Sequence, residues 1–245
     1  MKQALSKMAR MWELYFVIGV MLVSFLATFQ RNLVYAGLNQ LEHIGTLNRF
    51  LYSCIYENLI LALLAPGLTG LIGARVAREE ERPWKGLGKS AACSAAAFVL
   101  AYLLMLLVWL LIDPAASVRT DYTVLTNFRQ LYDRSMLLYC FCYIAYAALY
   151  AAAYGALSYG IIRRTGNQFY GVAMPLIFSY ICNYFVVMFP AEVANVLFYM
   201  LPMQNVDIVN GLTEAQNLAQ IGCTALFGVL LTWKGRPLSA AAKLS

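Results

Sequence analysis

The residue types that carry most enzyme chemistry are scarce in this sequence. Its 245 residues include one histidine, His43, with no cysteine or carboxylate cluster at metal-ligand spacing around it. The six cysteines lie in or beside apolar stretches and form no CxxC pair, which is typical of small buried apolar side chains. We therefore expect no metal site and no enzyme active site on this chain.

One short string is similar to part of a phosphate-binding loop. Gly86-Leu-Gly-Lys-Ser90 has the Gly-Lys-Ser end of that loop, but the full pattern requires a glycine where this chain has Pro83, and a β-strand before it. A membrane span would precede it here, and no other glycine-rich phosphate loop is present in the sequence. We expect any ATP hydrolysis to belong to a different subunit.

Two of the polar residues inside apolar stretches are candidates for a function. Glu57 is the only carboxylate well within a predicted span, and an ionisable group there is a functional candidate because burying it in lipid is costly. It could instead be hydrated, or paired with Arg49. Asn183 follows Pro175 by about two turns. We expect the proline to kink this span and to free carbonyl groups near the asparagine. The alternative is that the proline only shapes the helix.

A third candidate is a ridge of tyrosines within one predicted helix. Their spacing places all six within an arc of roughly 80°; they are Tyr132, Tyr139, Tyr143, Tyr146, Tyr150 and Tyr154. The opposite face carries Ala148, Ala152 and Ala156, which allow a neighbouring helix to approach closely. The ridge either lines a cavity or interface, where the hydroxyls find partners, or packs inside the bundle.

The composition identifies the elements that position these residues. The chain is 62% hydrophobic and 12% charged, with a mean hydropathy of +0.64, against about 45–50% and about 25% in soluble domains. This excludes a soluble globule and predicts an all-α integral membrane protein consisting of one transmembrane domain. Six spans are expected, at about 14–30, 51–73, 91–112, 135–162, 169–189 and 217–233, preceded by an interfacial helix at 1–13.

The basic residues predict the orientation. Thirteen of the 18 Lys and Arg residues fall on one side if the N-terminus is cytoplasmic, and five fall on the other: Arg31, Arg49, Arg119, Arg129 and Arg134. Since Lys and Arg concentrate in cytoplasmic loops, both termini are expected in the cytoplasm. An even number of spans agrees with this expectation. The predicted location is the plasma membrane of a bacterial cell, with multiple passes.

The connection 75–89 between the second and third spans carries charges of both signs. Its candidate contact residues are Arg78, Glu79, Glu80, Glu81, Arg82, Trp84 and Lys85. Pro83 ends or redirects a helix there, and Gly86 and Gly88 release the chain, so a short amphipathic helix across the membrane face is expected. An ordinary positive-inside loop is the alternative, although it requires only the basic residues, whereas a mixed-sign patch suits a docking partner.

This layout resembles the membrane subunit of ABC transporters of the ABC-2 class, similar to small permeases that export lipids, drugs or antimicrobial peptides. The resemblance covers the interfacial helix, the six spans, a coupling helix at Arg78 to Lys85, and a re-entrant outer helix at 190–202, which is too short to span. One feature departs from this family: the outer segment between spans three and four, from Asp113 to Arg134, is relatively large.

The resemblance implies a dimer of permease chains, as a homodimer or with a sister chain, each docked on a separate ATP-binding subunit. ATP and Mg²⁺ would bind that subunit, so no cofactor is expected on this chain, and no nucleic acid partner is expected. Closure of the ATP-binding subunits would push on the coupling segment and rock the spans. The competing classes are an ATP-independent carrier or channel, which a proton site at Glu57 would favour, and a substrate-capturing subunit of an importer.

Overall fold

The structure is a computed structural model that describes residues 11–36, 45–55, 59–112, 128–200 and 213–233. Within these ranges the chain is helical and contains no strand. The long helices are α2 (Trp12–Ala36), α4 (Leu59–Glu79), α5 (Pro83–Ile112), α7 (Met136–Thr165), α8 (Gln168–Val187) and α10 (Glu214–Trp233). The shorter elements are α3 (Thr46–Phe50), η2 (Leu51–Ile55), α6 (Arg129–Arg134) and α9 (Ala191–Met200).

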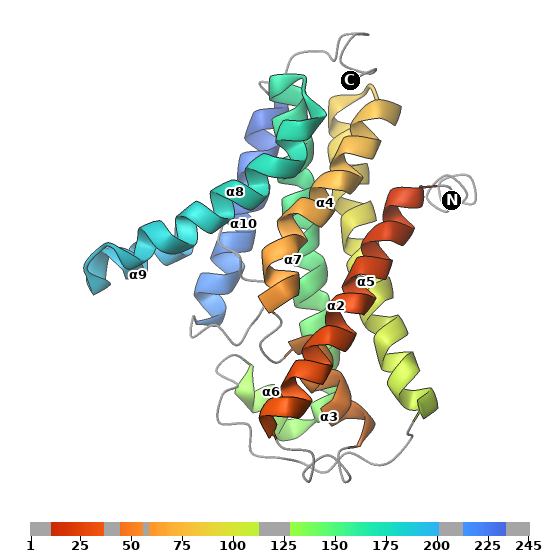
Figure 1. The fold of residues 1–245 in the computed structure, drawn as a ribbon. Coiled ribbons are helices and arrows are strands. Elements are labelled where there is room, and N and C mark those ends of the chain that lie inside the picture. The colour runs from red at the N-terminus through yellow and green to blue at the C-terminus, as the bar shows by residue number, and fades with distance from the viewer. Residues whose placement is uncertain (1–10, 37–44, 56–58, 113–127, 201–212, 234–245) are drawn as a thin grey trace.

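The long helices alternate in direction (Figure 1). The start of α2, the α4–α5 link, the α7–α8 turn and the end of α10 therefore lie at one end of the bundle, which we call the basic end. Its described basic side chains are Arg75, Arg78, Arg82, Lys85, Lys89, Arg163 and Arg164. The α7–α8 turn is tight because Gly166 adopts a left-handed conformation, with φ of 72°, at the C-cap of α7.

Four of the described helices are long and apolar enough to cross a membrane: Trp12–Arg31 within α2, together with α5, α7 and α10. This confirms the predicted class, a helical membrane protein. Helices α4 and α8 correspond to the other two predicted spans, and the apolar part of α8 runs over Gln168–Cys182. The total of six spans stays a prediction.

Helix α7 packs against α4, α5, α8 and α10 and forms the centre of the bundle (Figure 1). Small residues allow these close contacts. A Cβ on Gly228 of α10 would lie 2.6 Å from the carbonyl carbon of Ala156, one of the small residues that the sequence singles out. On the side facing α5, the Ser90 hydroxyl donates a hydrogen bond of 2.7 Å to the carbonyl of Gly155.

The predicted separate helix in the connection 75–89 is wrong. Helix α4 continues to Glu79 and α5 begins at Pro83, which leaves a link of three residues. Proline is well tolerated at the first position of a helix, where its missing N–H has no partner in any case. Gly86 does not release the chain, because it lies inside α5, where a Cβ would collide with the ring of Tyr159 on α7.

The second predicted span also begins differently. Residues 51–55, which the prediction includes in span two, form the π-helical turn η2, and the regular helix α4 begins at Leu59 and ends at Glu79 instead of Gly73. Side chains satisfy the backbone of this turn, since the Ser53 hydroxyl donates to the Phe50 carbonyl (3.1 Å) and the Tyr143 hydroxyl donates to the Cys54 carbonyl (3.3 Å). Trp109 Nε1 in turn donates to the Ser53 hydroxyl (3.1 Å).

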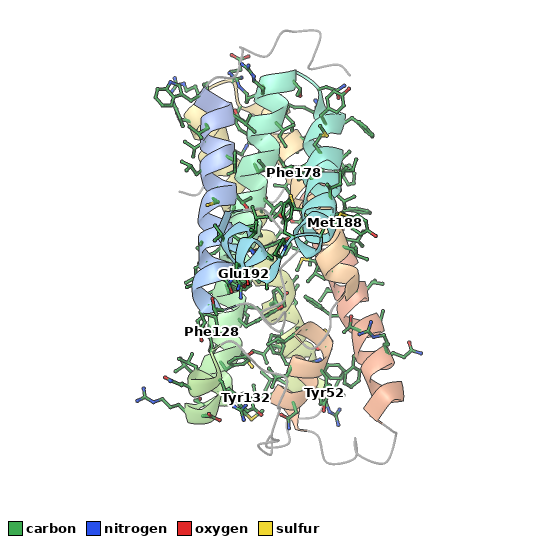
Figure 2. All side chains as sticks on the ribbon, turned by 90° about the vertical axis from the view of Figure 1, so that its left-hand side faces the viewer. Tyr52, Phe128, Tyr132, Phe178, Met188 and Glu192 are labelled. Atoms are coloured by element: carbon green, nitrogen blue, oxygen red, sulfur yellow. The ribbon has the colours of Figure 1, made fainter. Side chains whose placement is uncertain are left out.

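A helix is present where the re-entrant segment is predicted. Helix α9 begins one residue after Pro190, and Figure 1 shows α8 tilting away from the bundle before α9. Met188 and Glu192, at the junction of these helices, lie near half the height of the molecule in Figure 2. Whether α9 enters the outer leaflet stays a prediction. Residues 1–10 of the predicted interfacial helix and residues 113–127 of the outer segment lie outside the described residues.

Candidate functional site

The carboxylate of Glu79 joins α4 to α5 at the basic end. One of its oxygens lies 2.7 Å from Lys89 Nζ on α5, and the other lies 2.9 Å from Arg75 Nε, one turn earlier on α4. Partial burial on its own raises the pKa of this carboxyl, but the hydrogen bond and charge of Lys89, together with the charge of Arg75, outweigh burial and hold the pKa below its usual value. Glu79 is therefore charged, and its ion pair with Lys89 links α4 to α5.

Further polar contacts connect the link to other helices. Arg78 Nε donates a hydrogen bond of 2.7 Å to the side-chain oxygen of Gln168, the first residue of α8. Arg75 Nε lies 3.9 Å from the carboxylate of Glu13 on α2, which is 4% exposed. Within the segment, Lys85 Nζ lies 3.4 Å from the carboxylate of Glu80. The last turns of α4, which lead into the link, are thus attached to the ends of α2, α5 and α8, and the link itself contacts α5 through Glu80 and Lys85.

Several side chains of this segment face outward. Glu81, Arg82 and Lys85 are exposed, and the Trp84 side chain is 55% exposed. Other exposed aromatic side chains at the same end are Trp12, Phe169 and Trp233. Aromatic residues concentrate at the water interface of a membrane, and these positions are consistent with such an interface at the basic end. Both charged and aromatic groups are therefore available to a partner.

The prediction of one helix for all six tyrosines is wrong at Tyr132, which lies on α6, because the extended backbone of Ser135 separates α6 from α7. The other five tyrosines lie on α7 and are buried, and the ridge divides into two parts. In the first part the rings pack on other aromatic side chains: Tyr139 lies edge to face with Tyr132 (5.6 Å between centroids), and Tyr143 lies edge to face with Tyr102 of α5 (5.5 Å). The Tyr143 hydroxyl also holds η2 through the Cys54 carbonyl. This part of the ridge therefore packs inside the bundle, which is one of the two alternatives for the tyrosines that the sequence leaves open.

The second part of the ridge faces polar side chains of α10. Six residues form this polar seam: Tyr146, Tyr150, Tyr154, Asn217, Gln220 and Thr224. All six are buried. Together with Ile221 they enclose a cavity of about 10 Å³, which is about the space that one water molecule needs. This part of the ridge therefore lines a cavity, which is the second alternative for the tyrosines that the sequence leaves open.

Sequence reasoning missed the α10 half of the seam. Asn217, Gln220 and Thr224 recur at intervals of three and four residues, which places them on one face of a helix. Inside a predicted span such a polar stripe is a signal in itself, because each of these groups must find a partner away from water. A search of each span for polar residues at helical spacing would have found it.

The remaining predicted site residues are only partly described. Glu57 lies outside the described residues, and Asn183 lies in α8 but its side chain is outside them. Arg49, the suggested partner of Glu57, has its guanidinium 5.8 Å from the ring centroid of Trp109, a cation–π distance. In the described ranges no three His, Cys, Asp or Glu side chains are grouped as metal ligands would be.

Comparison of the chain with protein-family models, with curated proteins and with solved structures finds no match. The resemblance to ABC-2 permeases therefore stays a prediction that rests on the layout of the sequence. The class that the helices define is a helical membrane protein.

Proposed function

We propose that this chain is the membrane-spanning permease subunit of an ATP-binding cassette exporter. In this proposal it forms the substrate pathway as a dimer, and ATP hydrolysis takes place on separate subunits that dock at the basic end. This end faces the cytoplasm in the proposed orientation, since seven of the eleven described Lys and Arg residues lie there.

The observation that carries the proposal is the attachment of the α4–α5 link. A three-residue link between helices of 21 and 30 residues cannot move without moving both helices. The Glu79–Lys89 ion pair joins the two helices, and the Arg78–Gln168 hydrogen bond extends the connection to α8. A push on Glu80 to Arg82 would therefore reach several helices at once, which is the mechanical property that coupling to an external ATPase requires.

Trp84 is the proposed anchor for the ATP-binding subunit. Its side chain is more than half exposed, two residues past the link, and it is flanked by the exposed charges of Arg82 and Lys85. Buried tryptophans carry a large share of the binding energy in many protein interfaces, often 2 kcal/mol or more. Glu81 and Arg82 would add charge complementarity, which sets orientation and partner choice.

The test is the ATPase activity that purifies with the tagged chain from its native membranes. We expect wild type to carry ATPase activity and Trp84→Ala to carry roughly 30-fold less at limiting partner concentration, from a loss of about 2 kcal/mol. Phe169→Ala is the matched control, because it removes an exposed aromatic side chain from the same end of the bundle without touching the link. The control is expected to retain the activity.

Absence of ATPase activity from the wild-type material would contradict the proposal. Transport by the purified chain alone in liposomes, driven by a proton gradient, would support the ATP-independent carrier instead. In that case Glu57→Gln should abolish transport, since Glu57 is the carboxylate that the sequence places inside a span. If the exporter is correct, collapse of the proton gradient with ATP maintained leaves transport largely intact.

A further inference from the structure

The polar seam lies in the part of the bundle that the proposed topology places inside the membrane. Thr224 precedes Trp233, at the basic end of α10, by nine residues, which is about 14 Å along a helix. This distance is close to half of a hydrocarbon core of about 30 Å. Asn217 and Gln220 continue the same stripe toward the opposite end. The seam therefore runs from about mid-membrane outward.

The lining of the seam is unlike an ordinary helix contact in a membrane. Helices can associate in lipid through small or apolar side chains alone, and just beside the seam α7 and α10 do so at Ala156 and Gly228. In the seam, three phenol rings face two carboxamides and a hydroxyl. The rings of Tyr150 and Tyr154 lie 4.6 Å apart between centroids, and both side chains are buried with their hydroxyl groups. The cavity therefore suits a guest that makes hydrogen bonds.

The charge of the lining restricts that guest. None of the seam side chains is ionisable near neutral pH. The next charged residue along α10 is Glu214, one turn beyond Asn217, and its carboxylate already accepts a hydrogen bond of 2.8 Å from the backbone N–H of Phe128. A charged group in the seam would lose its water without gaining a counter-charge, which is costly. Neutral groups that donate and accept hydrogen bonds lose little there.

We propose that the transported molecule passes between α7 and α10, and that the seam takes its uncharged hydrogen-bonding groups, such as amides and hydroxyls, in place of water. This rests on the proposed function as a permease. In this structure the seam has room for a single water. A separation of α7 from α10 exposes the phenol and carboxamide groups to the guest, and the neutral lining disfavours a charged group at this step.

The test measures which reagents enter the seam. Gln220→Cys and Thr224→Cys each place a thiol in the lining, and Leu226→Cys places one on an exposed face of the same helix, which is in contact with lipid in the proposed topology. Membrane vesicles from the native cells, which contain the full chain and its partners, are treated with and without ATP. The reagents are hydroxyethyl, sulfonatoethyl and trimethylammonioethyl methanethiosulfonate, which are neutral, negative and positive respectively. Peptide mass spectrometry then locates each modified cysteine, so that the native cysteines can remain.

We expect the neutral reagent to modify both seam cysteines at least tenfold faster than either charged reagent, and at least tenfold faster than it modifies Leu226→Cys. Modification of neither seam cysteine above the Leu226→Cys rate would overturn the proposal, because the seam would then be closed to aqueous guests. Equal modification by the charged reagents would overturn the preference for neutral groups. The two proposals fail separately: absence of ATPase activity from the tagged chain purified from the same membranes refutes the exporter, whereas ATPase activity without modification of the seam cysteines in the presence of ATP refutes the seam alone.

Discussion

The closest approach of α7 and α10 permits a sharp test, because glycine is required at one position and not at another on the same helix. A Cβ on Gly228 would lie 2.6 Å from the carbonyl carbon of Ala156, 2.7 Å from its oxygen and 2.7 Å from the nitrogen of Leu157. All three atoms belong to the backbone, so no side-chain rotation can relieve the contact. Gly222, six residues earlier, has no atom within 4 Å of the same added group.

The magnitude follows from this geometry. Ordinary van der Waals contact begins at about 3.4 Å, so Gly228→Ala must separate the helices by close to 1 Å or strain the backbone, and such overpacking costs about 1–3 kcal/mol. Gly222→Ala instead improves helix propensity without a clash and should stabilise by about 0.4–1 kcal/mol. Gly228→Ala gains the same propensity, so the two alanine variants should differ in unfolding free energy by the overpacking cost, about 1–3 kcal/mol.

Both variants can be unfolded in mixed micelles with increasing sodium dodecyl sulfate and followed by far-ultraviolet circular dichroism. Because the same residue type is introduced into the same helix, differences in composition and helix propensity largely cancel. Equal midpoints for the two variants would refute the close packing of α7 on α10. A lower midpoint for Gly222→Ala than for Gly228→Ala would refute it more directly, since it would reverse the predicted order.

Three further predictions concern other parts of the bundle. Since the pKa of Glu79 is depressed in the folded protein, its charge adds stability near neutral pH that is progressively lost as the pH falls below 4.5. Glu79→Gln should therefore cost about 0.5–1 kcal/mol at pH 7 and less at pH 3, by thermal unfolding at both pH values. Tyr143→Phe removes the hydrogen bond to the Cys54 carbonyl and should speed amide hydrogen exchange in η2, about fivefold for a loss of about 1 kcal/mol. In intact cells an impermeant thiol reagent should label Arg129→Cys and not Asn167→Cys, and the reverse result would contradict the orientation.

Long apolar stretches made the helices predictable from the sequence. Helices α5, α7, α8 and α10 each overlap a predicted span almost completely, because some 20 apolar residues leave a chain few alternatives in lipid. The alternation of basic residues predicted which helix ends lie together, and Figure 1 shows those ends at one side of the bundle. These features are local in sequence, and each can be inferred without knowing the neighbours of a helix.

The features that the sequence analysis missed depend on residues far apart in the chain. The π-helical turn η2 is held by Tyr143, 89 residues from Cys54, and by Trp109, 56 residues from Ser53. A glycine is needed at position 86 because the ring of Tyr159 occupies the place where a Cβ would lie, and no local sequence pattern reveals this contact. Two features must be recognised to predict the polar seam: the tyrosines of α7 and the polar stripe of α10. Only the tyrosines were noticed, because they are several residues of one type at helical spacing.

The length of α5 determines how far the α4–α5 link stands above the lipid. The predicted hydrocarbon boundary lies at residue 91, so Pro83 to Ser90 carry the link about 12 Å past it, whereas a headgroup layer is about 5–8 Å thick. Trp12 and Trp233 lie within two residues of their predicted boundaries, at headgroup depth, while Trp84 stands about 10 Å out, beyond the headgroups. In the predicted topology a soluble protein would therefore reach Trp84 and the link acids without entering the lipid surface.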